Sequence, residues 1–332
     1  MAVHTLRSLG PDWFTEPCER CQQHGSWLEG WEFRSGAVLA EHRVSTKEGI
    51  ARATTWDAVY HTPDVTFIFN LEVARITGQK LLKESLVLSP PLERSVYTDP
   101  ATGNRYFGVN AAADMLALEY NAEVELVVHR ANPGNVNETP ISQMPLAILP
   151  FLLPSRYVPS DRLASYARSE FGSLPPGHQR VNAICGWIYD HLEYQPGSSN
   201  EETTADETLL KRAGICRDFS HLGIAFCRGL GIPARFVSCY AHLIPSDFHA
   251  VFEAYLDGRW WLFDATRQAD LDGLVRIGIG RDAAEVAFST PFGTFRPKVM
   301  EVHIAQSGAP SDLGPRTVDA ISIEETAACG NR

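Results

Sequence analysis

The hydrophobic and polar positions divide the chain into a first part with strand periodicity and a second part with helical periodicity. In the segment 65–73 every odd position is apolar, and a period of two predicts a strand with one buried face. Further strands are predicted over 50–60, 81–88 and 116–129, and no helical period lies between them. Successive strands without helices are typical of a β-sandwich.

After about residue 160 the apolar positions take the spacing of helices. The predicted helices span 160–171, 179–194, 204–213 and 216–230. Three strands are then predicted over 234–243, 248–256 and 259–265, with Asp257-Gly258 as a tight hairpin turn between the last two. Residues 267–290 are predicted to be loop with a short helical turn at 282–286, and 298–304 is one more strand.

Proline content sets the predicted domain limits. Six prolines fall between residues 132 and 159, where neither a helix nor a central strand is expected. We therefore expect a β-rich domain over 46–131, a proline-rich junction over 132–159 and an α+β domain over 160–306. Residues 1–45 are expected to be a poorly ordered extension. Residues 307–332 are rich in small and polar residues and are expected to be a flexible tail.

Composition narrows the class of protein. The 332 residues are 44% hydrophobic and carry a net charge of −11, which disfavours nucleic acid or an anionic membrane as a partner. We find no apolar run long enough to span a membrane and no secretory signal. Seven scattered cysteines suggest free thiols in a cytoplasmic protein. The oligomeric state is not indicated.

One pair of cysteines has the spacing of a metal site. Cys18 and Cys21 form a CxxC motif with His24 nearby. A structural zinc site needs four ligands, and no second pair exists, so we expect no metal here. A zinc site remains the alternative.

Cys216 is the candidate nucleophile. Gly214 ends one predicted helix and Cys216 begins the next, and the unpaired N–H groups at a helix N-terminus favour a thiolate. The same N–H groups can stabilise an oxyanion. Cys227, in the body of a helix, and Cys239, in a strand, are expected to be core residues.

The predicted hairpin brings a histidine and an aspartate together. With a two-residue turn at Asp257-Gly258, Val251 faces Asp264, which makes Asp264 a diagonal neighbour of His249 on one face. Such neighbours have a backbone separation of ~7–8 Å. A carboxylate at this position fixes the imidazole tautomer and stabilises its charged form. The pattern therefore predicts a Cys216–His249–Asp264 catalytic triad.

Other polar residues near Cys216 have simpler explanations. His221 is five residues further along the helix and points about 140° away from Cys216, so we favour a structural role. His242 remains an alternative base. Asp218 complements the helix dipole, and its side chain is expected to point away from the thiolate.

These segments resemble the transglutaminase-like superfamily, a branch of the papain-like cysteine enzymes whose bacterial members are often described as cysteine proteases. Residues 214–222 resemble the nucleophile segment, whereas 247–250 and 262–266 resemble the His and Asp segments. The family usually has proline where Ala265 stands. The first 45 residues have no counterpart.

The resemblance implies an α+β fold. An N-terminal β-sandwich-like domain would precede a catalytic domain over 160–306, in which the cysteine-bearing helix packs on an antiparallel sheet. The implied reaction is acyl transfer through a thioester on Cys216, with His249 as base and Asp264 as its partner. Tyr194 and Gln195 are candidates for a second oxyanion donor. No cofactor is needed, and residues 270–273, a fragment of a calcium-loop pattern, are expected to be a turn.

The resemblance leaves the outcome of the reaction open. A peptide or protein is the expected substrate, and hydrolysis by a peptidase or amidase is favoured over transfer to an amine acceptor. The alternative is a catalytically idle binding module on the same fold.

Overall fold

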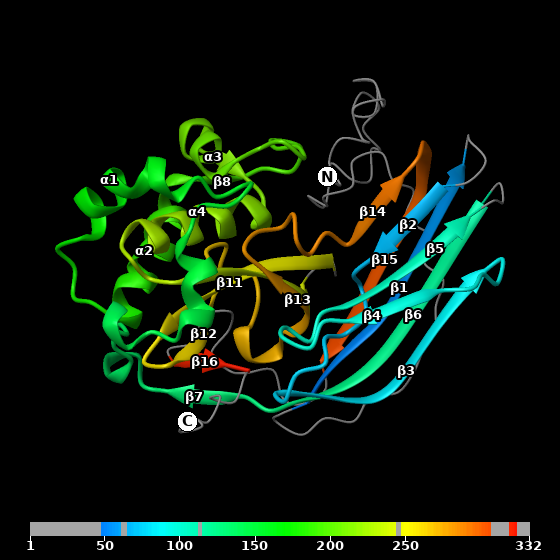
Figure 1. Cartoon of the computed structure of the whole chain (residues 1–332), viewed down its shortest axis with the longest axis horizontal. Helices are drawn as coiled ribbons and strands as arrows, with labels where there is room; N and C mark the ends of the chain where they lie inside the picture. Colours follow the sequence, from blue (N-terminus) through cyan, green and yellow to red (C-terminus); the bar gives the residue numbers. More distant parts are fainter. Residues whose placement is uncertain (1–47, 61–64, 112–114, 244–246, 307–318, 324–332) are drawn as a thin grey trace.

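The computed structural model describes residues 48–60, 65–111, 115–243, 247–306 and 319–323 (Figure 1). The expected extension over 1–45, which includes Cys18 and Cys21, lies outside the described residues. So does most of the expected tail.

Two four-stranded antiparallel sheets make up the strand-rich part, as the period of two predicts. The first has the order β15 (Phe295–Gln306), β1 (Glu48–Tyr60), β6 (Met115–Leu126) and β3 (Gln79–Ser89). The second has the order β14 (Ser289–Phe292), β2 (Val65–Phe69), β5 (Arg105–Ala111) and β4 (Ser95–Thr98).

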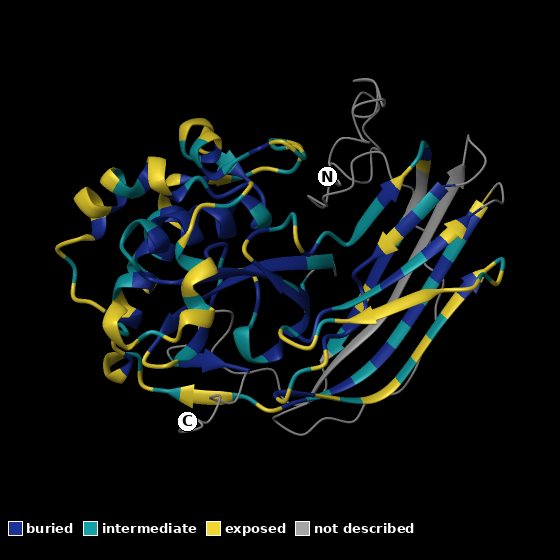
Figure 2. Cartoon of the chain, in the orientation of Figure 1, coloured by how far each residue is buried: buried dark blue, intermediate teal, exposed yellow. Residues whose placement is uncertain are grey.

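The buried faces of these two sheets share one hydrophobic core. Phe67 and Phe69 of β2 are in the same cluster as Leu118 and Tyr120 of β6. Buried residues alternate with more exposed ones along both strands (Figure 2). Alternation of this kind confirms that each sheet turns one face inward.

Strands from the end of the chain complete both sheets. β14 pairs with β2 and β15 pairs with β1, both antiparallel. Both strands fall within the segment 160–306. The β-rich part is therefore built from two distant stretches of sequence, and the predicted domain limits remain predictions.

The proline-rich segment contains three 3-10 turns, η3 (Pro133–Asn135), η4 (Ile141–Gln143) and η5 (Leu146–Leu152). The short strand β7 (His129–Ala131) comes directly before it.

The second part consists of helices packed on another antiparallel sheet. The helices are α1 (Ser160–Phe171), α2 (His178–His191), α3 (Ala205–Lys211) and α4 (Cys216–Gly229). The sheet has the order β12 (Arg259–Phe263), β11 (Asp247–Leu256), β10 (Ala234–Ala241) and β13 (Val275–Gly280). Two short strands, β8 (Glu193–Tyr194) and β9 (Ala213–Gly214), pair in parallel. The four predicted helices are confirmed, with limits that differ by a few residues.

Two predictions about the chain after residue 266 were wrong. β13 lies within the predicted loop 267–290, and both of its faces are buried. Val275, Ile277 and Ile279 do alternate, but the segment is short, and the glycines at 278 and 280 are uncommon in strands. β16 (Ala320–Ser322) lies within the expected tail, pairs with β7 and is buried, with Ile321 in a core cluster.

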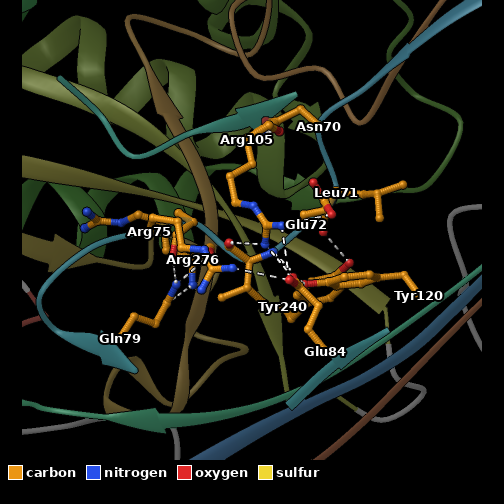
Figure 3. A network of polar contacts seen from close by, with 12 residues as sticks. Asn70, Leu71, Glu72, Arg75, Gln79, Glu84, Arg105, Tyr120, Tyr240 and Arg276 are labelled. Atoms are coloured by element: carbon orange, nitrogen blue, oxygen red, sulfur yellow. Dashed lines mark hydrogen bonds and ion pairs between the residues drawn. The ribbon is translucent and has the colours of Figure 1, made fainter. Parts of the chain in front are cut away.

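Polar contacts join the strand-rich part to the helix-bearing part (Figure 3). The Gln79 amide donates to the carbonyls of Ala74 and Arg276, and the Arg276 N–H donates to Gln79 Oε1. The Tyr240 hydroxyl donates to the Leu71 carbonyl, at 2.8 Å. Because these bonds are buried, they fix the segment after β2 against β10 and β13.

Two ionic clusters, one partly buried and one buried, flank this junction. In one, the Arg105 guanidinium lies between the carboxylates of Glu72 and Glu84. In the other, Glu253 accepts from both Arg235 and Arg276, and the side chains of Glu253 and Arg276 are fully buried. Buried charges of this kind require their partners.

Candidate active site

The start of α4 is held by polar contacts that place Cys216 at its first position. Asp218 Oδ2 accepts the Ile215 N–H at 3.0 Å, and Asp218 Oδ1 accepts from the Arg217 guanidinium. The Asp218 carboxylate is therefore bound to neighbouring donors in the first turn. A Cβ on Gly214 would lie 2.8 Å from the Asp218 Cβ, which explains the glycine before the helix.

Cys216 is seated against β11. Its Sγ accepts the backbone N–H of Ala250 at 3.1 Å, and the thiol side chain is buried. One turn further on, the Ser220 hydroxyl donates to the Ala250 carbonyl. These two contacts fix the sulfur next to the residue that follows His249.

His249 and Asp264 lie together, as the hairpin pattern predicts. His249 Nε2 is 3.1 Å from Asp264 Oδ2. The β11–β12 pairing has the predicted register, from Leu256 with Arg259 to Phe252 with Phe263. The pairing ends at Phe252 and Phe263, so the contact between Asp264 and His249 lies just beyond the paired residues.

The Asp264 carboxylate is held in place by its own loop. It accepts hydrogen bonds from the N–H groups of Thr266, Gln268 and Ala269 and from the Thr266 hydroxyl. Burial alone would raise the pKa of Asp264, but His249 and these donors hold it below its usual value. Asp264 is thus a charged, fixed partner for the imidazole.

The thiol and the imidazole influence each other. Burial holds the pKa of Cys216 above its usual value, although the nearby His249 and the Ala250 N–H act in the opposite direction. Burial by itself lowers the pKa of His249, but Asp264 and Cys216 raise it to about 10. Because Nε2 faces Asp264, Nδ1 is the ring nitrogen available to Cys216. The arrangement favours an imidazolium next to the sulfur.

A cavity of about 360 Å³ opens at Cys216 and His249. Its walls come from both parts of the molecule, because Asn70, Pro291 and Met300 of the strand-rich part also line it. Phe236, Phe248, Ile277 and Phe288 make much of the wall apolar. A substrate bound at Cys216 would therefore contact both parts.

Tyr194 and Gln195 lie behind the helix start. The Gln195 N–H donates to the Gly214 carbonyl at 2.9 Å, and the Tyr194 ring lies 5.8 Å from that of Phe219. Neither is among the residues that line the cavity. Their role as oxyanion donors remains a prediction.

His221 has the surroundings of a structural residue. It is fully buried, its Nε2 accepts the Ala283 N–H, and its ring stacks on Tyr157. Burial lowers the pKa of His221 well below the usual value. Cys227 and Cys239 are buried free cysteines, and burial raises the pKa of both.

The described residues contain no group of three or more His, Cys, Asp or Glu side chains placed to hold a metal ion. Asp272, in the predicted turn near 270–273, forms an ion pair with Arg130. No helix in the described part of the chain is long and apolar enough to cross a membrane.

Two cavity residues were given no role from the sequence pattern. Asn70 follows β2, far from Cys216 along the chain, and only the fold brings it to the cavity. Asp247 is in the His segment, two residues before His249. Because side chains alternate along a strand, the side chains of Asp247 and His249 lie on the same face of β11.

Comparison with known proteins identifies the family of this chain. The family model described as "Transglutaminase-like superfamily" matches residues 165–265. A crystal structure named "Putative Cysteine Protease", from Cytophaga hutchinsonii, is 38% identical over 84% of this chain and 98% of that chain, with a TM-score of 0.78. The chain belongs to the transglutaminase-like superfamily.

Two mycobacterial proteins are also similar to this chain. An uncharacterized protein of Mycobacterium leprae is 26% identical over 254 residues, which are 69% of this chain and 87% of that protein. An uncharacterized protein of Mycobacterium tuberculosis is 28% identical over 238 residues, 63% of this chain and 75% of that protein. The transglutaminase-like fold and the Cytophaga structure support a papain-like cysteine enzyme in general terms.

Proposed function

We propose that this protein is a cysteine-dependent hydrolase that cleaves peptide or carboxamide bonds through a thioester on Cys216. The observation that carries the proposal is the placement of one buried sulfur and one imidazole on the wall of the same cavity, with a carboxylate bound to the imidazole. Cys216 Sγ is fixed by the Ala250 N–H, and His249 Nε2 is fixed by Asp264. The roles of Cys216, His249 and Asp264 are part of the proposal.

In the first half of the reaction, the Cys216 thiolate attacks the carbonyl carbon of the substrate. The carbonyl oxygen gains the negative charge, which the N–H groups at the start of α4 would stabilise. The imidazolium of His249 gives its proton to the leaving nitrogen as the C–N bond breaks. An amine leaves, and the acyl group remains on sulfur as a thioester.

In the second half, neutral His249 takes a proton from water, and the resulting hydroxide oxygen attacks the thioester carbon. The C–S bond breaks, a carboxylic acid is released and the sulfur returns as a thiolate beside the imidazolium. Asp264 stabilises the charged imidazole at both stages. Transfer to an amine follows the same steps with the amine in place of water, and product analysis distinguishes the two.

The test is alkylation of Cys216 by iodoacetamide at pH 6, followed by mass spectrometry of the peptide that contains it. Because His249 favours the thiolate, we expect labelling much faster than that of a free peptide thiol, and loss of this advantage in His249→Ala. His303→Ala is the matched control, since the His303 side chain is 53% exposed on β15. Labelling of the wild type no faster than a peptide thiol would support the idle binding module instead.

A further inference from the structure

We propose that the cavity selects acyl donors that carry a protonated amino group near the scissile carbonyl, with Asp247 as its charged partner. The inference rests on the proposed function, because it assigns a substrate class to the same cavity. It concerns selectivity, so its test is separate from that of the chemistry at Cys216.

Asp247 is a carboxylate on the cavity wall beside the reacting groups. It is the first residue of β11 and lines the cavity together with Cys216 and His249. One carboxylate oxygen, Oδ1, accepts its neighbour's N–H, that of Phe248, at 2.7 Å. Among the described residues, no ion pair links Asp247 to a lysine or arginine.

Apart from His249, the other charged residues at the cavity do not neutralise Asp247. Arg217 is committed elsewhere, because its guanidinium donates to Asp218 Oδ1 and to the Asn200 carbonyl. Glu201, the remaining charged lining residue apart from the His249 imidazolium, is also acidic. Outside the proposed triad, the described residues that line the cavity include two carboxylates and one cation. That cation, Arg217, is already bound to Asp218.

The pKa of Asp247 is consistent with this environment. Burial raises it to about 6, against the opposing effects of the Phe248 N–H and of His249. The carboxylate is thus mostly charged at neutral pH yet poorly hydrated, and a ligand cation would recover part of the lost solvation.

A second, independent observation comes from Asn70, another residue that lines the cavity. Asn70 is 1% exposed, and its Nδ2 donates to the Arg105 carbonyl at 2.8 Å. Since a carbonyl only accepts, the amide orientation is fixed, and Oδ1 is left buried without a partner at the cavity. A ligand that donates a hydrogen bond would satisfy it.

The Asn70 amide lies beside a second buried polar group at the cavity. The Asn70 N–H donates to the Phe288 carbonyl, which places Asn70 beside Ser289. The Ser289 hydroxyl is also buried without a partner and lines the cavity. At Gly278 a Cβ would lie 2.8 Å from Asn70 Oδ1, so the glycine leaves room there.

Together these groups define the chemistry of the ligand. Asn70 Oδ1 and Asp247 only accept hydrogen bonds, and Ser289 can accept one. An ammonium group has three donors and a positive charge, whereas a carboxylate ligand would be repelled and would leave Asn70 Oδ1 unsatisfied. The apolar wall suits the carbon chain that carries the amine.

The test uses three thiol reagents that share one leaving group and differ in charge. They are 2-aminoethyl, 2-hydroxyethyl and 2-sulfonatoethyl methanethiosulfonate, with mixed-disulfide formation at Cys216 followed by mass spectrometry. The measured quantity is the rate ratio of the cationic to the anionic reagent, divided by the same ratio for a free peptide thiol. We expect a ratio above one for the wild type and a fall of about tenfold in Asp247→Asn.

The neutral reagent separates the two proposals. Its rate in Asp247→Asn is expected to stay within about twofold of the wild type, because only the ligand charge is affected. Asp247→Glu should restore the cation preference. Glu170→Gln, which removes one exposed charge from α1, is the matched control and should leave the ratio unchanged.

Each contrary outcome has a distinct meaning. A wild-type ratio no greater than that of the peptide thiol overturns the selectivity proposal even if Asp247→Asn does not fold. Equal slowing of all three reagents in Asp247→Asn also overturns it, because Asp247 would then act through His249. If the neutral reagent modifies wild-type Cys216 no faster than a peptide thiol, the proposed function itself fails.

Discussion

His249 Nε2 lies 3.1 Å from Asp264 Oδ2, although neither residue belongs to a pair of the β11–β12 ladder. The contact forms because Asp264 stands one residue beyond β12, where three backbone N–H groups and a hydroxyl hold its carboxylate. The orientation of the imidazole thus depends on a loop as well as on the hairpin.

Replacement of Asp264 by asparagine should reduce the reactivity of Cys216. The amide keeps a hydrogen bond but removes the charge that raises the pKa of His249. We expect iodoacetamide labelling at pH 7 to slow by on the order of 10²-fold. Asp190→Asn, on an exposed position of α2, is the control. Equal rates in Asp264→Asn and wild type would refute a role for this carboxylate.

The pH titration of His249 should lie far from that of an ordinary histidine. Its pKa is raised to about 10 by Asp264 and Cys216, so the ring should remain charged at pH 8. In Cys216→Ser we expect a lower pKa that is still above the usual value near 6.5, because Asp264 remains. Nitrogen chemical shifts, assigned by comparison with His249→Gln, measure both values.

The pKa shifts of His249 and Asp264 predict how the free energy of unfolding changes with pH. A raised histidine pKa stabilises the folded state at and below neutral pH, and this contribution is lost as the pH rises toward 10. The lowered pKa of Asp264 stabilises the fold above the usual pKa of an aspartate and is lost in acid. The free energies of unfolding in urea, measured for the wild type and His249→Gln across this pH range, should become equal at high pH. A difference that does not change with pH would contradict this explanation.

The buried cluster around Glu253 should matter far more for stability than a surface pair. Glu253→Gln leaves Arg235 and Arg276 without their full charge partner in the core, at a cost of about 3–5 kcal/mol in the free energy of unfolding. The matched variant Glu125→Gln disrupts an exposed pair with Lys80 and should cost less than about 1 kcal/mol. Similar urea midpoints for the two variants would exclude this difference.

His221 should prove structural. His221→Leu leaves the Ala283 N–H without its acceptor and should destabilise the fold by about 1–3 kcal/mol. Labelling of Cys216 in the folded variant is expected to stay near the wild-type rate. A loss of labelling as large as in His249→Ala, with unfolding unchanged, would assign His221 to the chemistry instead.

Sequence patterns predicted the parts of the site that depend on local spacing. The start of α4 at Cys216 follows from the glycine and the apolar period, and the contact of His249 with Asp264 follows from a two-residue turn. Asn70 could not be predicted in the same way, because its place at the cavity depends on how β2 lies against β13 and β14. Likewise β13 was missed, because the buried charge of Arg276 is balanced by Glu253, which is distant along the chain.

The edge strands β14 and β15 also bear on the synthesis of the protein. Each is the outermost strand of a sheet whose inner neighbour, β2 or β1, leaves the ribosome more than two hundred residues earlier. These late strands also contribute Pro291 and Met300 to the cavity. A nascent chain therefore carries its cysteine, histidine and aspartate before it has a complete cavity, and part of the cavity wall is added only when β14 and β15 have been synthesised.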